Sequence, residues 1–461
     1  MQQINVLENG LISSIDKLQT KQLQNIIDNL KEETTLLFPR GTYLLSTIFL
    51  KSNLHFVFES GCVILGSSNF YDYAKEEEIT YPLYQDSSHS YFDCSLFTGK
   101  NINNVSFIGP SIIDMQDSWD LDNVRDIVHR GPKAFAFKEC RDLIFKDFTL
   151  KNVTDLAIYF AGSENVLVKN IKMRVYIDGV SPDNSKNVLI EDCDIESGDD
   201  AIVFKSSYTL NRLDICESIE VRNCSLKSRC NAIKFGTETN GGFKNIYIHD
   251  IAIKETRLCG LAIESVDGAI IEDIKIENIN MKNVNAPLFI HLGKRMRGPK
   301  ELTIGSIKNI TINNIRATGP YLPYEVVAWN YDSYIKKDSI QYPWIFGSAE
   351  GVNDLKVASD GPWQFISNVC GLKEHPLTNI VLTNFDFTLS GGCNYYHKRV
   401  PEDAQDYPEV YVYGKILPAK GIYFRHIDGL ILKNINIKTL NDDIREDLIF
   451  DDIKNLNIIK E

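Results

Sequence analysis

The sequence predicts an all-β protein, a right-handed parallel β-helix in which short strands stack coil on coil. Two observations support this prediction. A phrase of the form Asn-Val/Ile-x-Ile/Val-x-Asn/Asp recurs along the chain, and apolar and polar residues alternate within each copy. Alternation with a period of two is typical of a strand with one buried face, and regular recurrence is typical of a solenoid. We therefore expect residues 1–461 to form a single domain.

The copies are spaced closely enough to stack. Their first apolar residues are Val166, Val188, Ile219, Ile246, Ile274 and Ile310, with outlying copies at Leu143, Ile380 and Leu430. The first four steps, from 166 to 274, are 22, 31, 27 and 28 residues. Units this short contain no ten-residue helical pattern, whereas a βαβ unit needs a crossover of about a dozen residues. Each inward apolar residue should therefore lie on its equivalent in the next coil, in parallel strands about 4.8 Å apart.

Other segments have separate expected roles. Leu23, Ile26, Ile27 and Leu30 have helical spacing, so residues 18–31 should form an amphipathic helix that closes one end of the solenoid. The segments 317–376 and 391–425 interrupt the repeat with aromatic-rich sequence and should be loop insertions, which could pack on the scaffold or stack on sugar rings. The recurring asparagines should satisfy backbone groups at turns; they are Asn170, Asn223 and Asn278.

Composition narrows the classes of partner and the cellular compartment. The hydrophobic content of 43% suits a globular core, and the formal net charge of −13 argues against nucleic acid or an anionic membrane as a partner. No run approaches the roughly 20 apolar residues of a membrane span, and the start lacks signal-peptide features. We expect a cytoplasmic protein, or a periplasmic or secreted one if a leader has been removed. The ten scattered cysteines should be reduced thiols packed as small apolar groups.

An adjacent pair of carboxylates is the strongest functional signal. Asp199 and Asp200 stand before an apolar strand, 22 residues after Asp178 and 31 before Asn231 at the second aspartate. The repeat should therefore place Asp178, Asp200 and Asn231 on consecutive coils of one face. Mutual repulsion raises the pKa of one carboxyl so that it holds a proton, as cleavage of a glycosidic bond requires. A solvated acidic turn or a calcium site would show the same residues.

Several segments resemble glycoside hydrolase family 28, the polygalacturonases and rhamnogalacturonase-like enzymes on the pectin-lyase-like solenoid. The resemblance lies in Phe38–Tyr43, Ile48–Asn53, Gly61–Ser67, Tyr176–Gly179 and Gly198–Asp200, and spans residues from about 20 to about 440. It implies an inverting hydrolase of pectin-derived poly- or oligosaccharides, with Asp199 as the general acid and with Asp178 and Asp200 activating water. It implies no metal and no other cofactor. The long insertions could wall off one end of a cleft and favour exo action.

The chain departs from this family at two positions. The family's Gly-His-Gly corresponds to Cys230-Asn231-Ala232, and its Arg-x-Lys, which holds a uronate carboxylate, corresponds to Ala262-Ile263-Glu264. An acid in place of a cation should repel a uronate. Either Lys205 and Lys234 rebuild an anion site one coil lower, with Arg229 close in register, or a neutral sugar such as rhamnose binds beside Glu264.

Further candidate binding residues lie in two phrases, Ile290–Arg295 and Tyr423–His426. We expect His291, Arg295 and Arg425 to contact sugar hydroxyls or a carboxylate, although a salt-bridged surface would have the same composition. Two other classes of function stay open. They are a calcium-dependent polysaccharide lyase, with the aspartates as metal ligands, and a non-catalytic carbohydrate-binding β-helix. The sequence does not indicate an oligomeric state.

Overall fold

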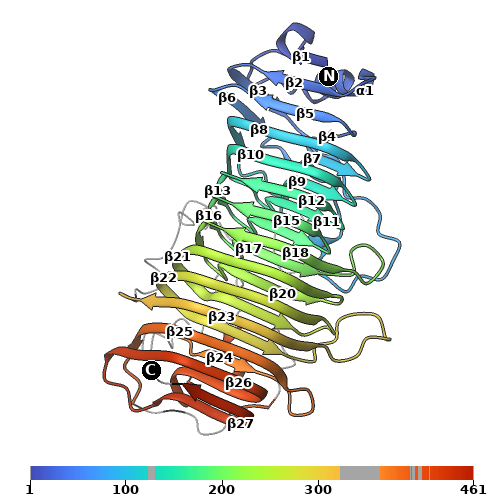
Figure 1. The fold of residues 1–461 in the computed structure, drawn as a ribbon. Coiled ribbons are helices and arrows are strands. Elements are labelled where there is room, and N and C mark those ends of the chain that lie inside the picture. Colours follow the sequence, from blue (N-terminus) through green and yellow to red (C-terminus); the bar gives the residue numbers. More distant parts are fainter. Residues whose placement is uncertain are drawn as a thin grey trace. The chain divides into compact units, whose positions relative to one another are not determined.

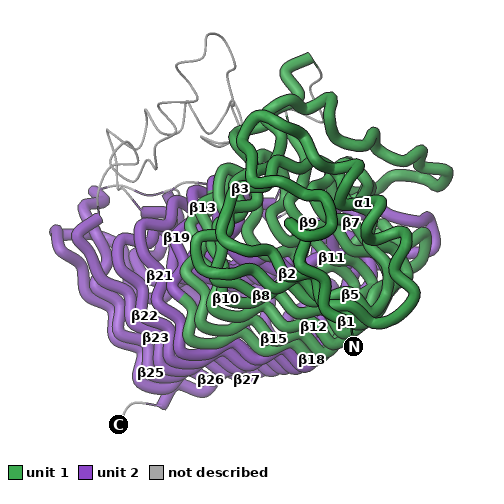
Figure 2. The backbone as a smooth tube through the Cα atoms, turned by 90° about the horizontal axis from the view of Figure 1, so that it is seen from above, with its two compact units in different colours: residues 1–197, 207–224 green, residues 198–206, 225–461 purple. Residues whose placement is uncertain are grey.

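A computed structural model describes residues 2–122, 130–321, 364–394, 396, 400–402, 408–414 and 416–459. The chain divides into two compact units, which Figure 2 colours separately. Unit 1 comprises Met1–Ser197 and Ser207–Cys224, and unit 2 comprises Gly198–Ser206 and Ser225–Glu461. Both units are built from parallel strands, so the protein is all-β, as predicted. That residues 1–461 form one domain stays a prediction.

Short strands form unit 1, up to three in each coil of chain (Figure 1). The elements are β1 (Gln2–Asn5), η1 (Leu7–Asn9), α1 (Thr20–Asn29), β2 (Thr34–Phe38), β3 (Gly41–Leu45), β4 (Ile48–Phe49), β5 (Leu54–Phe58), β6 (Cys62–Gly66), η2 (Phe70–Asp72), η3 (Ser87–His89), β7 (Ser95–Lys100), β8 (Asn103–Asp114), β9 (Lys133–Lys138), β10 (Arg141–Lys151), β11 (Ile158–Ala161), β12 (Glu164–Lys169), β13 (Lys172–Val175), β14 (Val180–Asp183), β15 (Lys186–Glu191), β16 (Asp194–Ser197) and β18 (Ile215–Arg222).

The register in unit 1 confirms the repeat. Val166 pairs with Val188, and Val188 pairs with Ile219, so equivalent positions of the phrase stack in parallel. Leu143 pairs with Val166 and extends the column by one coil. All four side chains are buried. The apolar column exists because each residue covers its equivalent in the next coil, which is the burial that the alternating pattern requires.

Longer strands dominate unit 2. The elements are β17 (Ile202–Ser206), β19 (Ser225–Ser228), β20 (Ile233–Thr239), β21 (Gly242–Ser265), β22 (Ile270–Leu292), β23 (Ser306–Thr318), β24 (Ser367–Cys370), β25 (Leu377–Gly391), η4 (Val410–Tyr413), β26 (Ala419–Asn441) and β27 (Glu446–Ile459). A second buried column runs through Ile246, Ile274, Ile310, Ile380 and Leu430. The outlying copies of the phrase therefore belong to the same ladder.

The recurring asparagines are part of the scaffold, as predicted. Asn170, Asn223 and Asn278 have φ values of 51°, 53° and 59°, in the left-handed region that asparagine tolerates better than most residues. Side-chain bonds link the same turn in successive coils: Asn170 donates to Asp147 at 2.7 Å, and Asn278 donates to Asp250 at 3.0 Å. These amides are used within the turns.

The segments outside the repeat match the predictions in part. Helix α1 lies within the predicted range 18–31 and buries Leu23 and Ile27. Most of the predicted insertion 317–376 falls outside the described residues, which resume at 364, and β24 lies in its last part. In the segment 391–425, η4 and the first strand residues of β26 are described. The aromatic residues that the sequence offered at 322–363 lie outside the described residues.

The thiols and the helix content also match expectation. All ten cysteines are free, and nine of them are buried, while Cys230 is partly exposed. In the part of the chain that the structure describes, no helix has the length and apolarity needed to cross a membrane.

Candidate active site

An aspartate pair stands immediately before strand β17 in unit 2. Asp199 and Asp200 follow Gly198, and the strand begins at Ile202. The carboxylate oxygens of both aspartates and the sulfur of Cys230 lie within 4.8 Å of one another. Asp200 is buried, whereas Asp199 is partly exposed to solvent. The two neighbouring carboxylates therefore have different surroundings, as a division of labour between an acid and a base requires.

Asn231 holds Asp200 in place. Its backbone N–H and its Nδ2 donate to Oδ1 of Asp200 at 3.0 and 2.9 Å. Its own Oδ1 accepts the backbone N–H of Cys259 at 3.1 Å, so the amino side of the amide faces Asp200. These bonds confirm that Asn231 lies one coil after Asp200, as the spacing of 31 residues predicted. That Asn231 binds substrate stays a prediction.

Ser228 ties the backbone of Asp199 to the following coil. Its hydroxyl donates to the carbonyl oxygen of Asp199 at 2.6 Å and accepts the N–H of Cys230 at 2.8 Å. Together with Asn231, this serine anchors both residues of the pair. The sequence analysis missed Ser228, because its function depends on a contact across 29 residues.

A buried cluster of charged residues lies next to the aspartate pair, and we call it the Lys234 cluster. It consists of Lys234, Glu264 and Glu409. The lysine Nζ lies 2.5 Å from Oε1 of Glu409 and 3.5 Å from Oε1 of Glu264. None of the three residues is more than 4% exposed. Nδ2 of Asn231 also donates to Glu409, at 3.4 Å, so the cluster is joined directly to the groups that hold Asp200.

Burial raises the pKa of both glutamates in this cluster. For Glu264 the loss of hydration raises the pKa well above its ordinary value, and the nearby carboxylates of Glu409 and Asp200 raise it further, while Lys234 opposes the rise. The same burial raises the pKa of Glu409, and Lys234 again opposes it. Among the described residues, neither oxygen of Glu264 has a hydrogen-bond partner. One lysine faces two acids and lies closer to Glu409, so Glu264 is the acid that keeps its proton.

The other predicted cationic residues in unit 2 also have carboxylate partners. Nζ of Lys205 lies 2.6 Å from Glu238, and both side chains are nearly buried. Arg295 donates to both oxygens of Asp267, from Nε at 3.0 Å and from Nη2 at 2.5 Å. Arg229 is buried in the loop between β19 and β20. Binding of substrate by these side chains stays a prediction.

Two more predicted residues lie on neighbouring strands in one register column. Glu264 on β21 pairs with His291 on β22, and Arg425 lies two strand pairings further along, on β26. Nδ1 of His291 lies 2.7 Å from the hydroxyl of Tyr413, on η4. The guanidinium of Arg425 lies 5.0 Å from the ring centre of Tyr413, and its Nη1 donates to the carbonyl of Val400. The structure thus brings His291 and Arg425 together beneath η4.

Asp178 belongs to unit 1. It lies between β13 and β14, is buried, and accepts the backbone N–H of Ala157 at its carbonyl oxygen at 3.0 Å. Val180, two residues later, pairs with Ile158 on the preceding coil, 22 residues earlier. The step of 22 residues therefore holds within unit 1. That Asp178 meets Asp199 and Asp200 stays a prediction.

The donor atoms at the aspartate pair do not suit calcium. Among the described residues, two carboxylates and one thiol come together here. Calcium takes about six to eight oxygen ligands, and a thiol favours softer metals. One of the Asp200 oxygens already accepts two N–H groups. The alternative of a calcium-dependent lyase therefore gains no support from this position.

Glu409 is the residue of this site that the sequence analysis did not find. It lies 175 residues from Lys234, in a segment that does not carry the repeat, so no register relates the two. The only sequence signal is the alternating apolar run Val410–Tyr413 that follows it, which indicates that the segment packs against the protein.

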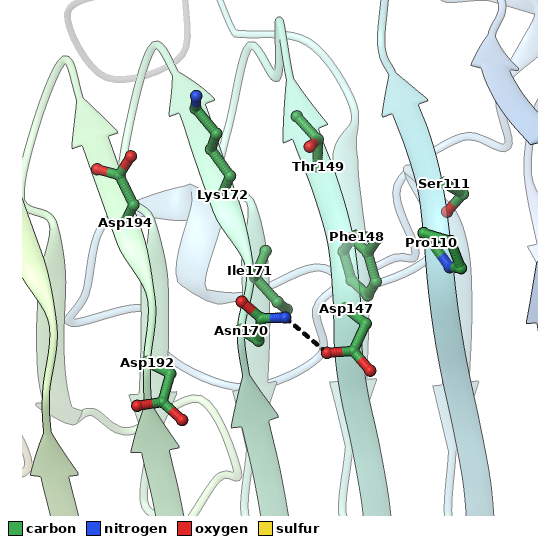
Figure 3. Close-up of a pocket in the computed structure, with 10 residues that line it drawn as sticks. All are labelled: Pro110, Ser111, Asp147, Phe148, Thr149, Asn170, Ile171, Lys172, Asp192 and Asp194. Atoms are coloured by element: carbon green, nitrogen blue, oxygen red, sulfur yellow. Dashed lines mark hydrogen bonds between the residues drawn. The ribbon is translucent and has the colours of Figure 1, made fainter. Parts of the chain in front are cut away.

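A second concave region lies in unit 1 and has a structural explanation. Figure 3 shows this groove of about 370 Å³ at a corner of the coils, where Asn170 points to Asp147 and bonds to it. Its polar side chains belong to the turn ladder described above. The lining residues are Pro110, Ser111, Asp147, Phe148, Thr149, Asn170, Ile171, Lys172, Asp192 and Asp194.

Stacked parallel strands with an anchored aspartate pair define a class of solenoid proteins with a polar site at the start of one strand. Comparison of the sequence with family models identifies the particular family. The chain belongs to the glycosyl hydrolases family 28, whose model matches residues 35–327.

Individual relatives are distant. A probable polygalacturonase from Vitis vinifera is 23% identical over 300 residues, which cover 61% of this chain and 61% of that protein. An endo-polygalacturonase from Pectobacterium carotovorum subsp. carotovorum is 24% identical over 222 residues, or 43% of this chain and 53% of that protein. The chain thus spans between about half and three fifths of the length of these curated relatives.

Solved structures share the fold. An exopolygalacturonase from Thermotoga maritima superposes with a TM-score of 0.67 at 17% identity, covering 95% of this chain and 92% of that one. A family 28 exopolygalacturonase from Yersinia enterocolitica gives a TM-score of 0.63 at 15% identity, covering 99% and 78%. At such identities the likeness concerns the fold.

Proposed function

We propose that the protein is a glycoside hydrolase that cleaves glycosidic bonds in pectin-derived poly- or oligosaccharides. The observation that carries the proposal is the aspartate pair, in which a partly exposed Asp199 stands beside a buried Asp200 clamped by Asn231. Membership of family 28 and the polygalacturonase names of its relatives support the substrate class. No cofactor is needed for this reaction, because carboxyl groups supply both the acid and the base.

The roles of the aspartates follow from their surroundings and from the family resemblance. Asp199 is the general acid, since it is the more accessible of the two, and Asp200, with Asp178 of unit 1, activates the water. Inversion is the course that the resemblance implies. Carboxyl groups in inverting enzymes usually stand about 6.5–9.5 Å apart, and in retaining ones about 5–5.5 Å. The oxygens of Asp199 and Asp200 are closer than the first range, so the stereochemistry needs a direct measurement.

A screen of defined fragments tests the proposal. We expect reducing ends to appear from fragments of homogalacturonan or rhamnogalacturonan, with the first product in the anomeric form opposite to that of the cleaved linkage. Proton NMR during the first minutes reads both the linkage and the anomeric form. An unsaturated product that absorbs near the ultraviolet would instead indicate a lyase. Retention of configuration would contradict the assigned roles, and absence of any cleavage would contradict the function.

The fold itself extends to a finer proposal. The stacked coils form a right-handed parallel β-helix, and α1 caps its N-terminal end. The burial of Leu23 and Ile27 supports the cap, because a helix lying on the last coil covers apolar surface that would otherwise face water. The family 28 structures with the same fold support the handedness.

The enzyme acts at chain ends. In β21 and β22 the alternating burial pattern gives way to runs, 256–265 and 283–292, in which every residue is buried, so both faces are covered there. Part of the cover is η4, whose Val410 and Tyr413 pack with Phe289 and Tyr423. A polymer lying along this face would meet the inserted segment. The exopolygalacturonase names of two structures with this fold agree with exo action.

Viscosity distinguishes exo from endo action. We expect long pectic chains to release products of one or two sugars from the first time point, while the viscosity of the solution falls slowly relative to the rise in reducing ends. An endo-acting polygalacturonase on the same polymer is the control. A steep early loss of viscosity with few reducing ends would contradict exo action.

A further inference from the structure

Carboxylates neutralise the cations on the unit 2 side of the aspartate pair. Lys234 lies 2.5 Å from Glu409 and 3.5 Å from Glu264, and Lys205 lies 2.6 Å from Glu238. These are the two lysines that could replace the arginine and lysine missing from the family pattern. A uronate carboxylate placed beside them would meet negative charge that is already present, in a site sheltered from water. Like charges brought together in such a site cost several kilocalories.

Glu409 is held in its position by the residues that follow it. Val410 and Tyr413 are 1% and 2% exposed and belong to an apolar cluster that includes Ala262 and Phe289. The hydroxyl of Tyr413 also bonds to His291 at 2.7 Å. Moving Glu409 away from Lys234 would strip this cover from the sheet. The ion pair is therefore a fixed part of the fold.

The surface beside the aspartates suits apolar parts of a sugar. Cys230 is partly exposed, and its sulfur lies within 4.8 Å of the carboxylate oxygens of Asp199 and Asp200. Tyr411 is also partly exposed, and its ring centre lies 5.6 Å from that of Phe365. Burial raises the pKa of Tyr411, and the charges of Glu409 and Cys230 raise it further, which places the phenol near both. Aromatic rings and sulfur favour C–H groups over a carboxylate.

We infer that the sugar bound against Cys230 and Tyr411 is neutral, a hexose or a 6-deoxyhexose, and that Glu409 is the residue that excludes a uronate from this position. The inference rests on the proposed hydrolase function and refines its substrate class. It assigns to this subsite a backbone residue that carries CH₂OH or CH₃ where galacturonate carries its carboxylate. Such residues occur where a pectic backbone contains neutral sugars alongside uronates.

Binding to an inactive protein tests this inference apart from turnover. In the Asp199→Asn protein, we expect a rhamnose–galacturonate disaccharide fragment to bind at least about tenfold more tightly than digalacturonate by calorimetry, a ratio that corresponds to about 1.4 kcal/mol. Adding Glu409→Gln removes one negative charge and leaves Lys234 free to attract a carboxylate, so this ratio should fall by about tenfold. Glu301→Gln, at an exposed acid of unit 2, is the matched control and should leave the ratio unchanged.

The outcomes separate the two claims. Equal or tighter binding of digalacturonate to the Asp199→Asn protein overturns the neutral subsite and leaves the hydrolase function standing. An equal effect of Glu409→Gln and Glu301→Gln overturns the role of Glu409. If Glu409→Gln does not fold, the ratio in the Asp199→Asn protein alone decides on the neutral subsite, and Glu409→Asp, which keeps the charge on a shorter side chain, replaces it. Binding of neither fragment, with no cleavage by the wild type, overturns both proposals.

Discussion

Replacing Asp199 by asparagine should lower kcat on a pectic fragment by about two to four powers of ten, the usual contribution of a general acid. The amide has no proton to give to the leaving oxygen, whereas its shape matches that of the carboxyl group. Asp199 is partly exposed and lies within 4.8 Å of the Asp200 oxygens, so the substitution removes repulsion and opens no cavity. The melting temperature should therefore stay the same or rise, and KM should change little. Initial rates and thermal unfolding of the purified variant measure both effects.

Asp192→Asn is the matched control for this substitution. Asp192 is exposed, lies in the turn groove of unit 1 and has a φ of 57°, which asparagine tolerates. It should retain wild-type kcat. Wild-type turnover by Asp199→Asn would contradict the proposed role of Asp199, and so would a loss of activity that simply parallels a loss of folded protein.

Replacing Lys234 by methionine should destabilise the protein by about 3–5 kcal/mol at neutral pH, because it leaves two buried acids without their cation. Lys234 is 2% exposed and contacts both Glu264 and Glu409, so water cannot replace the lost charge. The pKa values of both acids are raised in the folded state, and the folded protein therefore holds more protons than the unfolded chain above the ordinary glutamate pKa of 4.5. Their contribution to stability is complete below that value and is lost as the pH rises.

The pH dependence distinguishes this mechanism from a simple loss of packing. Lys234 lowers both raised pKa values, so its removal should steepen the fall in the free energy of unfolding between pH 5 and pH 8. Urea unfolding across this range measures the slope. Lys308→Met breaks an exposed ion pair with Glu272 and, as the control, should cost no more than about 1 kcal/mol. A loss from Lys234→Met that is equal at all pH values would contradict the charge argument.

The repeat made most of the fold predictable. A residue that must be buried in every coil recurs in the sequence at the length of the coil, and the pairing of Val166 with Val188 and of Ile274 with Ile310 has this origin. The same spacing predicted that Asn231 follows Asp200 by one coil, and the two hydrogen bonds between them confirm it. Helix α1 was predictable from its apolar spacing, and its bounds differ from the predicted ones by two residues at each end.

The environment of the candidate site was less predictable. Lys205 and Lys234 were identified as possible anion binders from register alone, yet each lies against a carboxylate. Register relates residues within the ladder, whereas Glu409 reaches the ladder from a segment outside it. The union of Asp178 with the aspartate pair stays a prediction from the repeat.

By itself, the sequence determined the stacking of the coils and the position of the aspartate pair within one of them, because burial on one face imposes a period that can be read along the chain. Only the tertiary structure decided which charges beside that pair are neutralised. Electrostatic pairing acts through space and has no period, so a glutamate 175 residues away could cancel Lys234 without a trace in the repeat.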